Sequence, residues 1–207
     1  MSAIKGIHDN FTFTYTTCNA MLSDSTVLYQ QQVEHEGHIY TNAMHNAIIE
    51  HCFMKIYLAW EILLEKSFIS YLKNEPDLKG NTYVRYGFPE DDEHAYNMIK
   101  GTKNYPDWTN INDVKYLANI YFKDAGVYAI LNSPMIEIED IKNIRNRISH
   151  VSEKSVKAFH RLLAKTITQT SNIEVADFLM FFKDQTQTYF TYYTDIIKGY
   201  ADAICNQ

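Results

Sequence analysis

The chain has 207 residues, of which 46% are hydrophobic and 14% aromatic, and its formal net charge is −6. This length and apolar share suit one globular domain with a buried core, and they exclude a disordered chain. Seven glycines and four prolines are few, which disfavours a fold of many short strands. We therefore expect a single all-α domain over residues 1–207.

The cysteines and the start of the chain indicate the compartment. Cys18, Cys52 and Cys205 form no CxxC pair, and the N-terminus lacks the apolar stretch of a signal peptide. We therefore expect a reducing cytoplasm and no structural disulfide. The most hydrophobic stretch, residues 48–64, is interrupted by four charged or polar side chains, which predicts a buried helix rather than a membrane span.

The charge is distributed unevenly. Residues 142–165 hold seven Lys/Arg and one acid, a local charge of +6, whereas the rest of the chain carries 12 Lys/Arg and 24 Asp/Glu, a charge of −12. A basic patch on an acidic body attracts a polyanion locally and repels it elsewhere. Two solvated helix faces are the alternative explanation, and charge alone does not decide between them. The basic residues are Lys142, Arg145, Arg147, Lys154, Lys157, Arg161 and Lys165.

The first residues of the chain fit more than one structure. Threonines alternate with aromatic residues over 11–16, which is typical of either a short strand or an extended arm within residues 1–16. From about Cys18 the pattern becomes helical, with a break expected near Gly37.

Residues 40–73 give the clearest helical pattern. Apolar side chains recur there at steps of three and four, which predicts a helix with one buried face. The positions are Ile49, Cys52, Phe53, Ile56, Trp60, Leu63 and Leu64.

Residues 74–134 are expected to form a long excursion of loops and short helices between the core helices. Prolines and glycines predict a loop over 74–89, and an acidic cluster opens a short helix over 90–100. After a loop with Gly101 and Pro106, Asn112 or Asp113 is expected to cap a helix that reaches Phe122. A further helical piece covers 125–131, and no residue of the excursion indicates a role.

In the last third of the chain, Ser133 and Pro134 predict a break. A helix over 137–150 and a second helix from Ser152 to about Thr170 are predicted after it. One or two aromatic-rich helices follow over 175–204. Their aromatic residues suit core packing or a dimer seam better than base stacking. These are Phe181, Phe182, Tyr189, Phe190, Tyr192 and Tyr193.

The polar residues of segment 141–151 separate from the apolar ones on a helical wheel. A buried stripe is predicted for Ile141, Ile144, Ile148 and Val151. Arg145 and Ser149 fall beside this stripe, and Asn146 and His150 share a face nearly opposite it. The polar groups can meet in one site only if the helix ends near His150 or a second surface covers this face.

Arg145 and Asn146, with His150 five residues after the arginine, match the Arg-x(4–6)-His signature and so resemble the HEPN superfamily. The helix containing Trp60 and Glu61 is similar to the first core helix of these domains. The likeness covers about 40–73 and 135–170, and it is closest to stand-alone HEPN ribonuclease toxins. It implies a helical bundle, a homodimer and metal-independent RNA cleavage. In one subgroup Tyr stands two residues after the His, but here Ser152 does, so nucleotidylation at that position is not supported.

Histidine and arginine suit metal-free RNA cleavage. His150 is the predicted acid/base, because both imidazole forms are accessible near neutral pH, and Arg145 is the predicted phosphate clamp. Asn146 would orient His150 or donate to phosphate, with Ser149 in support. The resemblance implies that both protomers contribute Arg145 and His150 to one composite cleft. Considered without the family, a rim salt bridge and an exposed histidine remain the alternative.

The surroundings of these residues give further candidates. Arg147, Lys154, Lys157 and Arg161 are predicted to bind RNA. Glu61 or Glu65 could pair with Arg145 and fix its rotamer, although an exposed acidic helix face near Lys66 explains both equally well.

Other kinds of site find no support. His35, His38, His45 and His51 are expected on the surface, because no carboxylate or cysteine pattern completes a metal site, and no metal or other cofactor is expected. No phosphate-binding glycine loop and no nucleophile signature occurs.

The sequence therefore predicts a cytoplasmic, metal-independent endoribonuclease of a toxin or antiphage-defence type. RNA, a second copy of the chain and an antitoxin or other regulatory protein are its expected partners, with no membrane. A non-catalytic HEPN module that binds RNA or nucleotides and a purely structural dimeric helical protein are the rival hypotheses. Comparing RNA cleavage with and without EDTA, in wild type and His150→Ala, separates the three.

Overall fold

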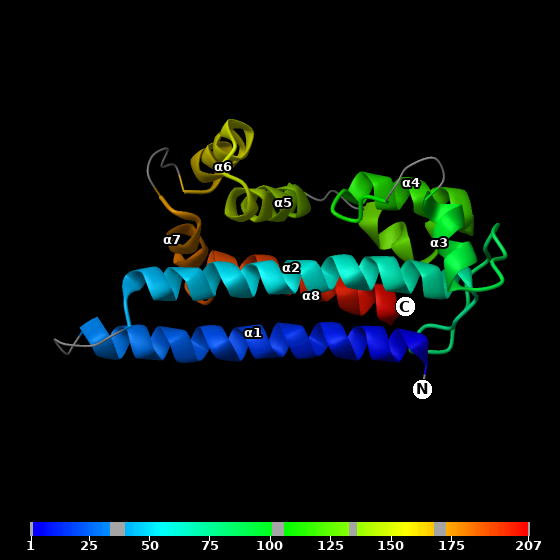
Figure 1. Ribbon diagram of the computed structural model, residues 1–207, viewed down its shortest axis with the longest axis horizontal. Helices are drawn as coiled ribbons and strands as arrows, with labels where there is room; N and C mark the ends of the chain where they lie inside the picture. The colour runs from blue at the N-terminus through cyan, green and yellow to red at the C-terminus, as the bar shows by residue number, and fades with distance from the viewer. Residues whose placement is uncertain (1, 34–39, 101–105, 133–135, 168–172, 207) are drawn as a thin grey trace. The chain divides into compact units, whose positions relative to one another are not determined.

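The computed structural model of the chain describes residues 2–33, 40–100, 106–132, 136–167 and 173–206. Every regular element in these ranges is helical, and no strand forms there beyond two isolated bridges, Arg85 with Phe122 and Phe182 with Thr188. The all-α prediction is confirmed (Figure 1). Among the described residues, no helix combines the length and the apolar character that crossing a membrane requires.

Most of the predicted helices are present with modest shifts at their ends, but the piece expected over 125–131 belongs to a 3₁₀ segment in which Asp124, Ala125 and Gly126 have positive, non-helical φ. The elements are α1 (Ala3–Val33), α2 (Asn42–Leu72), α3 (Asp92–Lys100), α4 (Ile111–Tyr121), the 3₁₀ segment η1 (Lys123–Asn132), α5 (Ile136–Ser149), α6 (Glu153–Thr166), α7 (Val175–Met180) and α8 (Tyr189–Cys205). The expected break at Gly37, the punctuation at Ser133 and Pro134 and the end of the second basic helix near Thr170 lie outside the described residues.

The N-terminal segment differs from its prediction. Helix α1 begins at Ala3, so the short strand or extended arm expected within residues 1–16 is wrong. The alternation over 11–16 was misleading because Phe11 is buried while Phe13 is exposed on the same helix. Helical spacing, rather than alternation, therefore decides which of these aromatic rings is covered.

Two helix starts show how capping sets the boundaries. Helix α4 is capped by Asn110, whose side chain accepts from the amide of Asn112, so the cap lies two residues before the earlier of the two positions expected. Helix α6 was expected to start at Ser152 and begins at Glu153, because Ser152 is its cap and accepts a hydrogen bond from the Ser155 amide at 3.2 Å.

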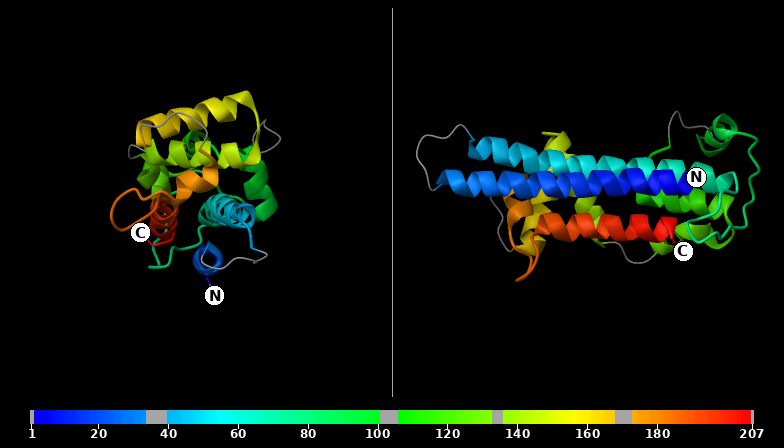
Figure 2. Two further views of the ribbon diagram at one scale, coloured as in Figure 1. Left: turned by 90° about the vertical axis from the view of Figure 1, so that its left-hand side faces the viewer. Right: turned by 90° about the horizontal axis from the view of Figure 1, so that it is seen from below.

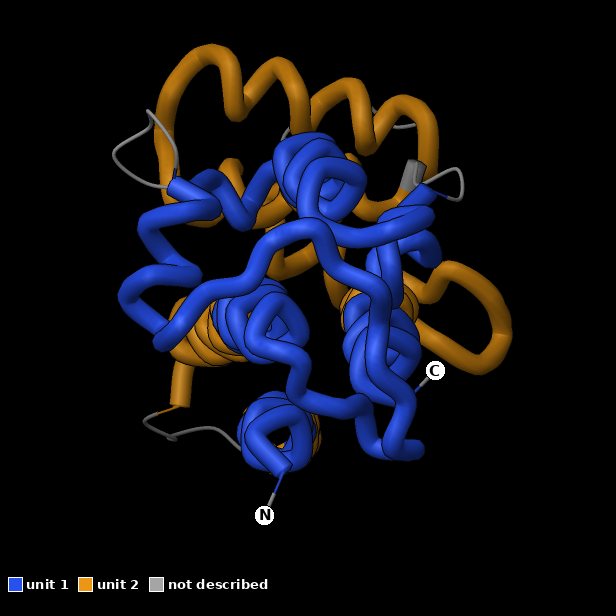
Figure 3. Tube along the Cα trace, turned by 90° about the vertical axis from the view of Figure 1, so that its right-hand side faces the viewer, with its two compact units in different colours: residues 1–12, 59–135, 197–207 blue, residues 13–58, 136–196 orange. Residues whose placement is uncertain are grey.

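The chain divides into two compact units, coloured separately in Figure 3. Unit 1 consists of residues 1–12, 59–135 and 197–207, and unit 2 of residues 13–58 and 136–196. The division falls within α1, α2 and α8, so neither unit is a continuous stretch of sequence. The prediction of a single domain stays a prediction.

Unit 1 is built around the last turns of α2. The buried ring of Phe68 lies 5.1–5.7 Å, centroid to centroid, from Trp108, Phe122 and Tyr128. The hydroxyls of Ser67 and Tyr128 are 2.8 Å apart, which satisfies two polar groups inside this aromatic cluster. The excursion predicted for residues 74–134 is therefore packed onto α2 by aromatic contacts.

The carboxylate of Asp77 stabilises the loop that follows α2. Buried Asp77 accepts from the Lys79 and Asn81 amides and from the Tyr83 hydroxyl, the last at 2.6 Å. Burial raises the pKa of the Asp77 carboxyl, but these hydrogen bonds outweigh burial and hold the pKa below its ordinary value. The turn is thereby stabilised without a helix or a strand.

Unit 2 contains the helix that carries the Arg–His motif. Figures 1 and 2 show α5 between α6 on one side and the first part of α2 on the other. Phe53 of α2 packs edge-on against Phe190 of α8 at 6.2 Å, and Phe159 of α6 against Phe178 of α7 at 5.7 Å. The C-terminal aromatic residues are divided, because Tyr189, Phe190 and Tyr193 are buried whereas Phe181 and Phe182 are exposed.

A buried polar cluster joins α1 and α2 within unit 2. Ser25 Oγ lies 2.7 Å from His45 Nδ1 and 2.5 Å from the Tyr40 hydroxyl, and the His45 ring stacks on Tyr29 at 4.7 Å. The expectation of a surface histidine is therefore wrong for His45, which is 5% exposed, and right for His51. His35 and His38 lie outside the described residues.

The buried imidazole makes stability depend on pH. Burial lowers the pKa of His45 in the folded chain. Below about pH 6.5 the imidazole is therefore protonated more readily in the unfolded chain than in the folded one. We expect the wild type to lose stability as the pH falls through this range. His45→Gln is expected to cost about 1 kcal/mol at pH 7.5 through its lost hydrogen bond, and this cost is expected to shrink toward pH 5.

Urea unfolding at a series of pH values measures this effect. His51→Gln, on the exposed side of the same helix, is the matched control and is expected to keep the pH dependence of the wild type. A gap between wild type and His45→Gln that stays constant from pH 7.5 to pH 5 would contradict the assignment.

Candidate functional site

The buried stripe of α5 fixes the rotation of this helix and so the direction of its polar residues. Ile138, Ile141 and Ile144 are buried, as the wheel required for the last two. Val151 was expected in the same stripe but is 88% exposed, because α5 ends at Ser149 and the chain leaves its helical path. The stripe thus covers only the first part of the motif.

Arg145 lies at the rim of the stripe, on the side of α5 that faces α2. Its guanidinium carbon lies 5.7 Å from the centre of the Tyr57 ring, a cation–π contact. Its Nη1 also donates to Asn146 Oδ1 at 3.2 Å. The guanidinium is thus held by a ring and an amide, and Asn146 supports the arginine in this structure.

Ser149 is the last residue of α5, and His150 follows it directly. The Ser149 hydroxyl lies 3.8 Å from the sulfur of Met54 on α2, and the His150 amide still donates to the Asn146 carbonyl at 2.9 Å. The side chain of His150 is exposed. The structure therefore places Arg145 on α5 against α2, and His150 just after the end of α5 and open to solvent, without a hydrogen bond between the two side chains.

Hydrogen bonds fix the short turn that follows His150. Ser155 Oγ donates to the His150 carbonyl at 2.7 Å, and Ser152 caps α6. These bonds hold the backbone of His150 against the first turn of α6 and leave its imidazole uncovered within unit 2.

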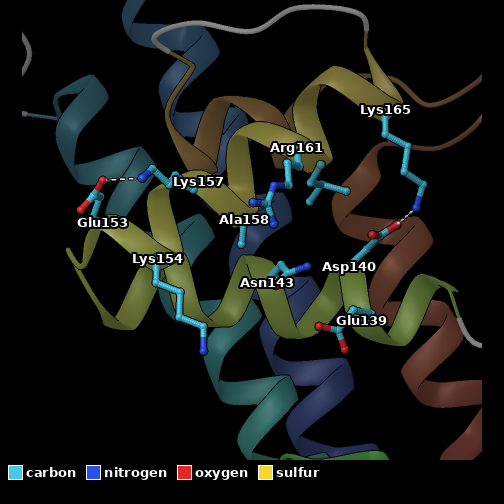
Figure 4. A pocket seen from close by; sticks show the side chains of 10 residues that line it. Glu139, Asp140, Asn143, Glu153, Lys154, Lys157, Ala158, Arg161 and Lys165 are labelled. Carbon is cyan, nitrogen blue, oxygen red and sulfur yellow. Dashed lines mark hydrogen bonds and ion pairs between the residues drawn. The ribbon is translucent and has the colours of Figure 1, made fainter.

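A groove of about 620 Å³ separates α5 from α6 and holds three of the four predicted RNA-binding residues. Figure 4 shows Arg161 and Asn143 on facing walls of this groove. Asn143 shares a helical face with Asn146 and His150, because the steps between them are three and four residues. The groove lining is Glu139, Asp140, Asn143, Glu153, Lys154, Lys157, Ala158, Arg161, Leu162 and Lys165.

Two ion pairs use part of the positive charge of this groove. Lys165 contacts Asp140 at 2.8 Å, and Lys157 contacts Glu153 at 2.5 Å (Figure 4). Lys154 and Arg161 make no ion pair with any described residue. These two cations, with the Asn143 amide beside them, are the groups that remain available to an anion.

Arg147, the fourth predicted RNA-binding residue, lies elsewhere. It lines a separate pocket of about 460 Å³ with Glu50 of α2, His160 of α6 and Glu174. Burial raises the pKa of Glu50, Glu174 raises it further, and Arg147 lowers it. Arg147 therefore faces carboxylates, which the helical wheel of α5 alone could not show.

The supporting acid Glu61 belongs to unit 1, whereas Arg145 belongs to unit 2. Glu61 and Glu65 are half-buried on α2 rather than fully exposed. Their pairing with Arg145 stays a prediction. Within the described residues no cluster of His, Cys, Asp or Glu has the composition of a metal site, and all three cysteines are free and buried.

Several residues of these sites were not expected from the sequence. Asn143 could have been found, because it lies on the wheel beside Asn146 and His150. Tyr57, Glu50 and Glu174 could not, because each comes from a segment far from the motif in sequence and only the fold brings it to α5.

No protein-family model, curated protein or solved structure matches the chain. The resemblance to HEPN domains therefore rests on the residues of the motif and on the helices within 40–73 and 135–170.

The buried partner of Lys165 yields a stability prediction. Burial raises the pKa of the Asp140 carboxyl and Lys165 lowers it, so removing the lysine leaves a carboxylate that is costly to ionise. Lys165→Met is expected to cost about 1–2 kcal/mol near pH 8, a value discounted because Lys165 is half exposed. The cost is expected to fall toward pH 4, where Asp140 becomes protonated.

Chemical denaturation at pH 4 and pH 8 measures this cost. Lys157→Met is the control, because Lys157 and its partner Glu153 are both exposed and their pair adds little stability. Equal losses for the two variants at pH 8 would refute the role given to Asp140.

Proposed function

We propose that the chain is a HEPN-type, metal-independent endoribonuclease that acts as a homodimer. The observation that carries the proposal is the arrangement on α5, where Arg145 is held in a defined position and His150 is exposed at the helix end. The all-helical fold agrees with the resemblance but does not by itself identify the family.

Arg145 supplies the electrostatic part of the chemistry. Its guanidinium remains charged at any working pH and can donate two parallel hydrogen bonds to phosphate oxygens. The Tyr57 ring and the Asn146 amide restrict its rotamers, so less entropy is lost when phosphate binds. In the transition state of cleavage, this charge stabilises the extra negative charge on the phosphorane.

His150 supplies the proton transfers. The neutral imidazole can take the proton of the ribose 2′-hydroxyl, whose oxygen then attacks the phosphorus, and an imidazolium can protonate the departing 5′-oxygen. One imidazole on one helix does not provide both roles at once. Two protomers, each with its exposed His150, would supply a base and an acid to one cleft, with Arg145 of each beside them.

The groove between α5 and α6 would hold RNA next to this cleft. Lys154 and Arg161 provide cationic groups that form no ion pair with the residues that the structure describes, and Asn143 provides an amide on the helical face shared with His150. Since the acids of the same groove compensate much of its charge, it fits one phosphate rather than a long stretch of backbone. The toxin or antiphage-defence role, the antitoxin and the cytoplasmic location are part of this proposal.

Cleavage of RNA in the presence of EDTA tests the proposal. Wild type is expected to cleave, and His150→Ala is expected to lose about 10²–10⁴-fold in rate, the usual contribution of a general acid or base. His51→Ala, an exposed histidine of α2, is expected to cleave like wild type. Unchanged cleavage by His150→Ala would reject the catalytic assignment, and binding without cleavage would favour a non-catalytic HEPN module.

The oligomeric state provides an independent check. Sedimentation velocity at the concentrations of the cleavage assay is expected to give a dimer. A fully active monomer would rule out the composite site. A dimer with negligible RNA affinity even at low salt would instead indicate a structural protein.

The salt dependence of RNA binding tests the groove. For single-stranded RNA, each lost phosphate contact lowers the slope of log K against log salt by about 0.7. Lys154→Ala and Arg161→Ala are each expected to show this reduction. Lys183→Ala removes the same charge from the exposed surface of unit 2, outside the groove, and is expected to keep the wild-type slope.

A further inference from the structure

The pocket at Arg147 combines four polar side chains that do not satisfy one another. Glu50, Arg147, His160 and Glu174 line its 460 Å³, and none of their side chains makes a hydrogen bond or an ion pair with a described residue. A pocket of this size lies within the range of about 300–1,000 Å³ for small-molecule sites. Its donors and acceptors are therefore free to bind a ligand.

The charge of the pocket excludes a phosphate as that ligand. Two carboxylates face one guanidinium, so the acids outnumber the permanently charged base in this pocket. Burial and, after it, the nearby Glu174 carboxylate raise the pKa of Glu50. A neutral group that donates hydrogen bonds would relieve this repulsion, whereas an anion would increase it.

The pocket also offers limited apolar contact. Ile148 and Ile173, both partly exposed, complete its lining together with Phe159 and Val175, which are buried. Polar groups therefore dominate the pocket, and single-stranded RNA is recognised mainly through bases that leave the stack and bind by their hydrogen-bonding edges.

Guanine matches the polar groups better than the other bases of RNA. Only guanine presents two adjacent donors, N1–H and the N2 amine, which one carboxylate can accept together. Its O6 and N7 form the acceptor pair to which arginine donates in a bidentate manner. Adenine, cytosine and uracil have neither this donor pair nor this O6/N7 acceptor pair. We propose that the Arg147 pocket binds the guanine base of a nucleotide beside the scissile phosphate.

The position of the pocket agrees with this role. Arg147 and His150 are three residues apart, so their side chains are neighbours on the surface of one helix, at about 5–6 Å between Cβ atoms. The His150 amide still donates to the Asn146 carbonyl, which keeps the helical geometry up to that residue. A base held at Arg147 would therefore place its own phosphate near His150. In naming the base, the inference rests on the proposed ribonuclease function.

Equilibrium binding to uncleavable RNA tests the pocket separately from catalysis. The probes are 2′-fluoro hexanucleotides that differ at one position, which carries guanine, adenine, cytosine, uracil or hypoxanthine. Wild type is expected to bind the guanine probe about tenfold or more tightly than the adenine probe. The hypoxanthine probe, which lacks only the N2 amine, is expected to lose most of that preference.

Variants identify the groups responsible. The variants Glu50→Gln, Glu174→Gln and Arg147→Met each change one residue of the pocket lining. The ratio of guanine-probe to adenine-probe affinity is expected to fall toward one in Arg147→Met and in at least one of the two Gln variants. Asp24→Asn removes the same charge from the exposed surface of unit 2, outside both the pocket and the groove, and is expected to keep the preference. Circular dichroism and thermal melting confirm that each variant is folded before its binding is compared.

The outcomes separate this inference from the function on which it rests. Two results would reject guanine binding in the pocket even if the protein cleaves RNA. One is equal affinity of wild type for all five probes, and the other is a guanine preference that no pocket variant reduces. A guanine preference without any cleavage of natural RNA would support the pocket and reject the ribonuclease. Absence of RNA binding would overturn both.

Discussion

Burial of three isoleucines on α5 determines where every polar group of the candidate site lies. With Ile138, Ile141 and Ile144 in the core, the rotation of the helix cannot change without exposing apolar surface. Each buried isoleucine contributes about 1.5–3 kcal/mol relative to an exposed one, which far exceeds the contribution of any rim contact. Arg145 is consequently directed toward α2, Asn143 toward α6 and Arg147 toward the pocket with Glu50.

This constraint explains which parts of the structure could be predicted from the sequence. The periodicity of the isoleucines, the cap at Ser152 and the apolar face of α2 are local signals, and the helices they predicted are present. The sides of Arg145 and His150 on α5 followed from the same periodicity. Val151 was misplaced because a wheel assumes that the helix continues, whereas capping of the next helix ended it at Ser149.

The rest depended on contacts between segments distant in sequence. The burial of His45 follows from its hydrogen bond to Ser25 on another helix, and no local pattern distinguishes it from the exposed His51. The pocket at Arg147 needs Glu50 and Glu174, which lie about a hundred and about thirty residues away along the chain. The local charge predicted one basic patch, whereas in the structure Lys154, Lys157 and Arg161 line the groove and Arg147 lines the pocket.

The hydrogen-bonded turn between α5 and α6 affects how the ligand preference of such a protein can evolve. The hydrogen bond from Ser155 Oγ to the His150 carbonyl joins the start of α6 to the residue that follows α5, so Arg145, Arg147 and His150 all belong to one helical hairpin. The acids that face Arg147 come from α2 and from the segment before α7, outside that hairpin. Substitutions at positions 50 and 174 can therefore change what the pocket accepts without moving the histidine, so ligand preference and chemistry are free to evolve separately.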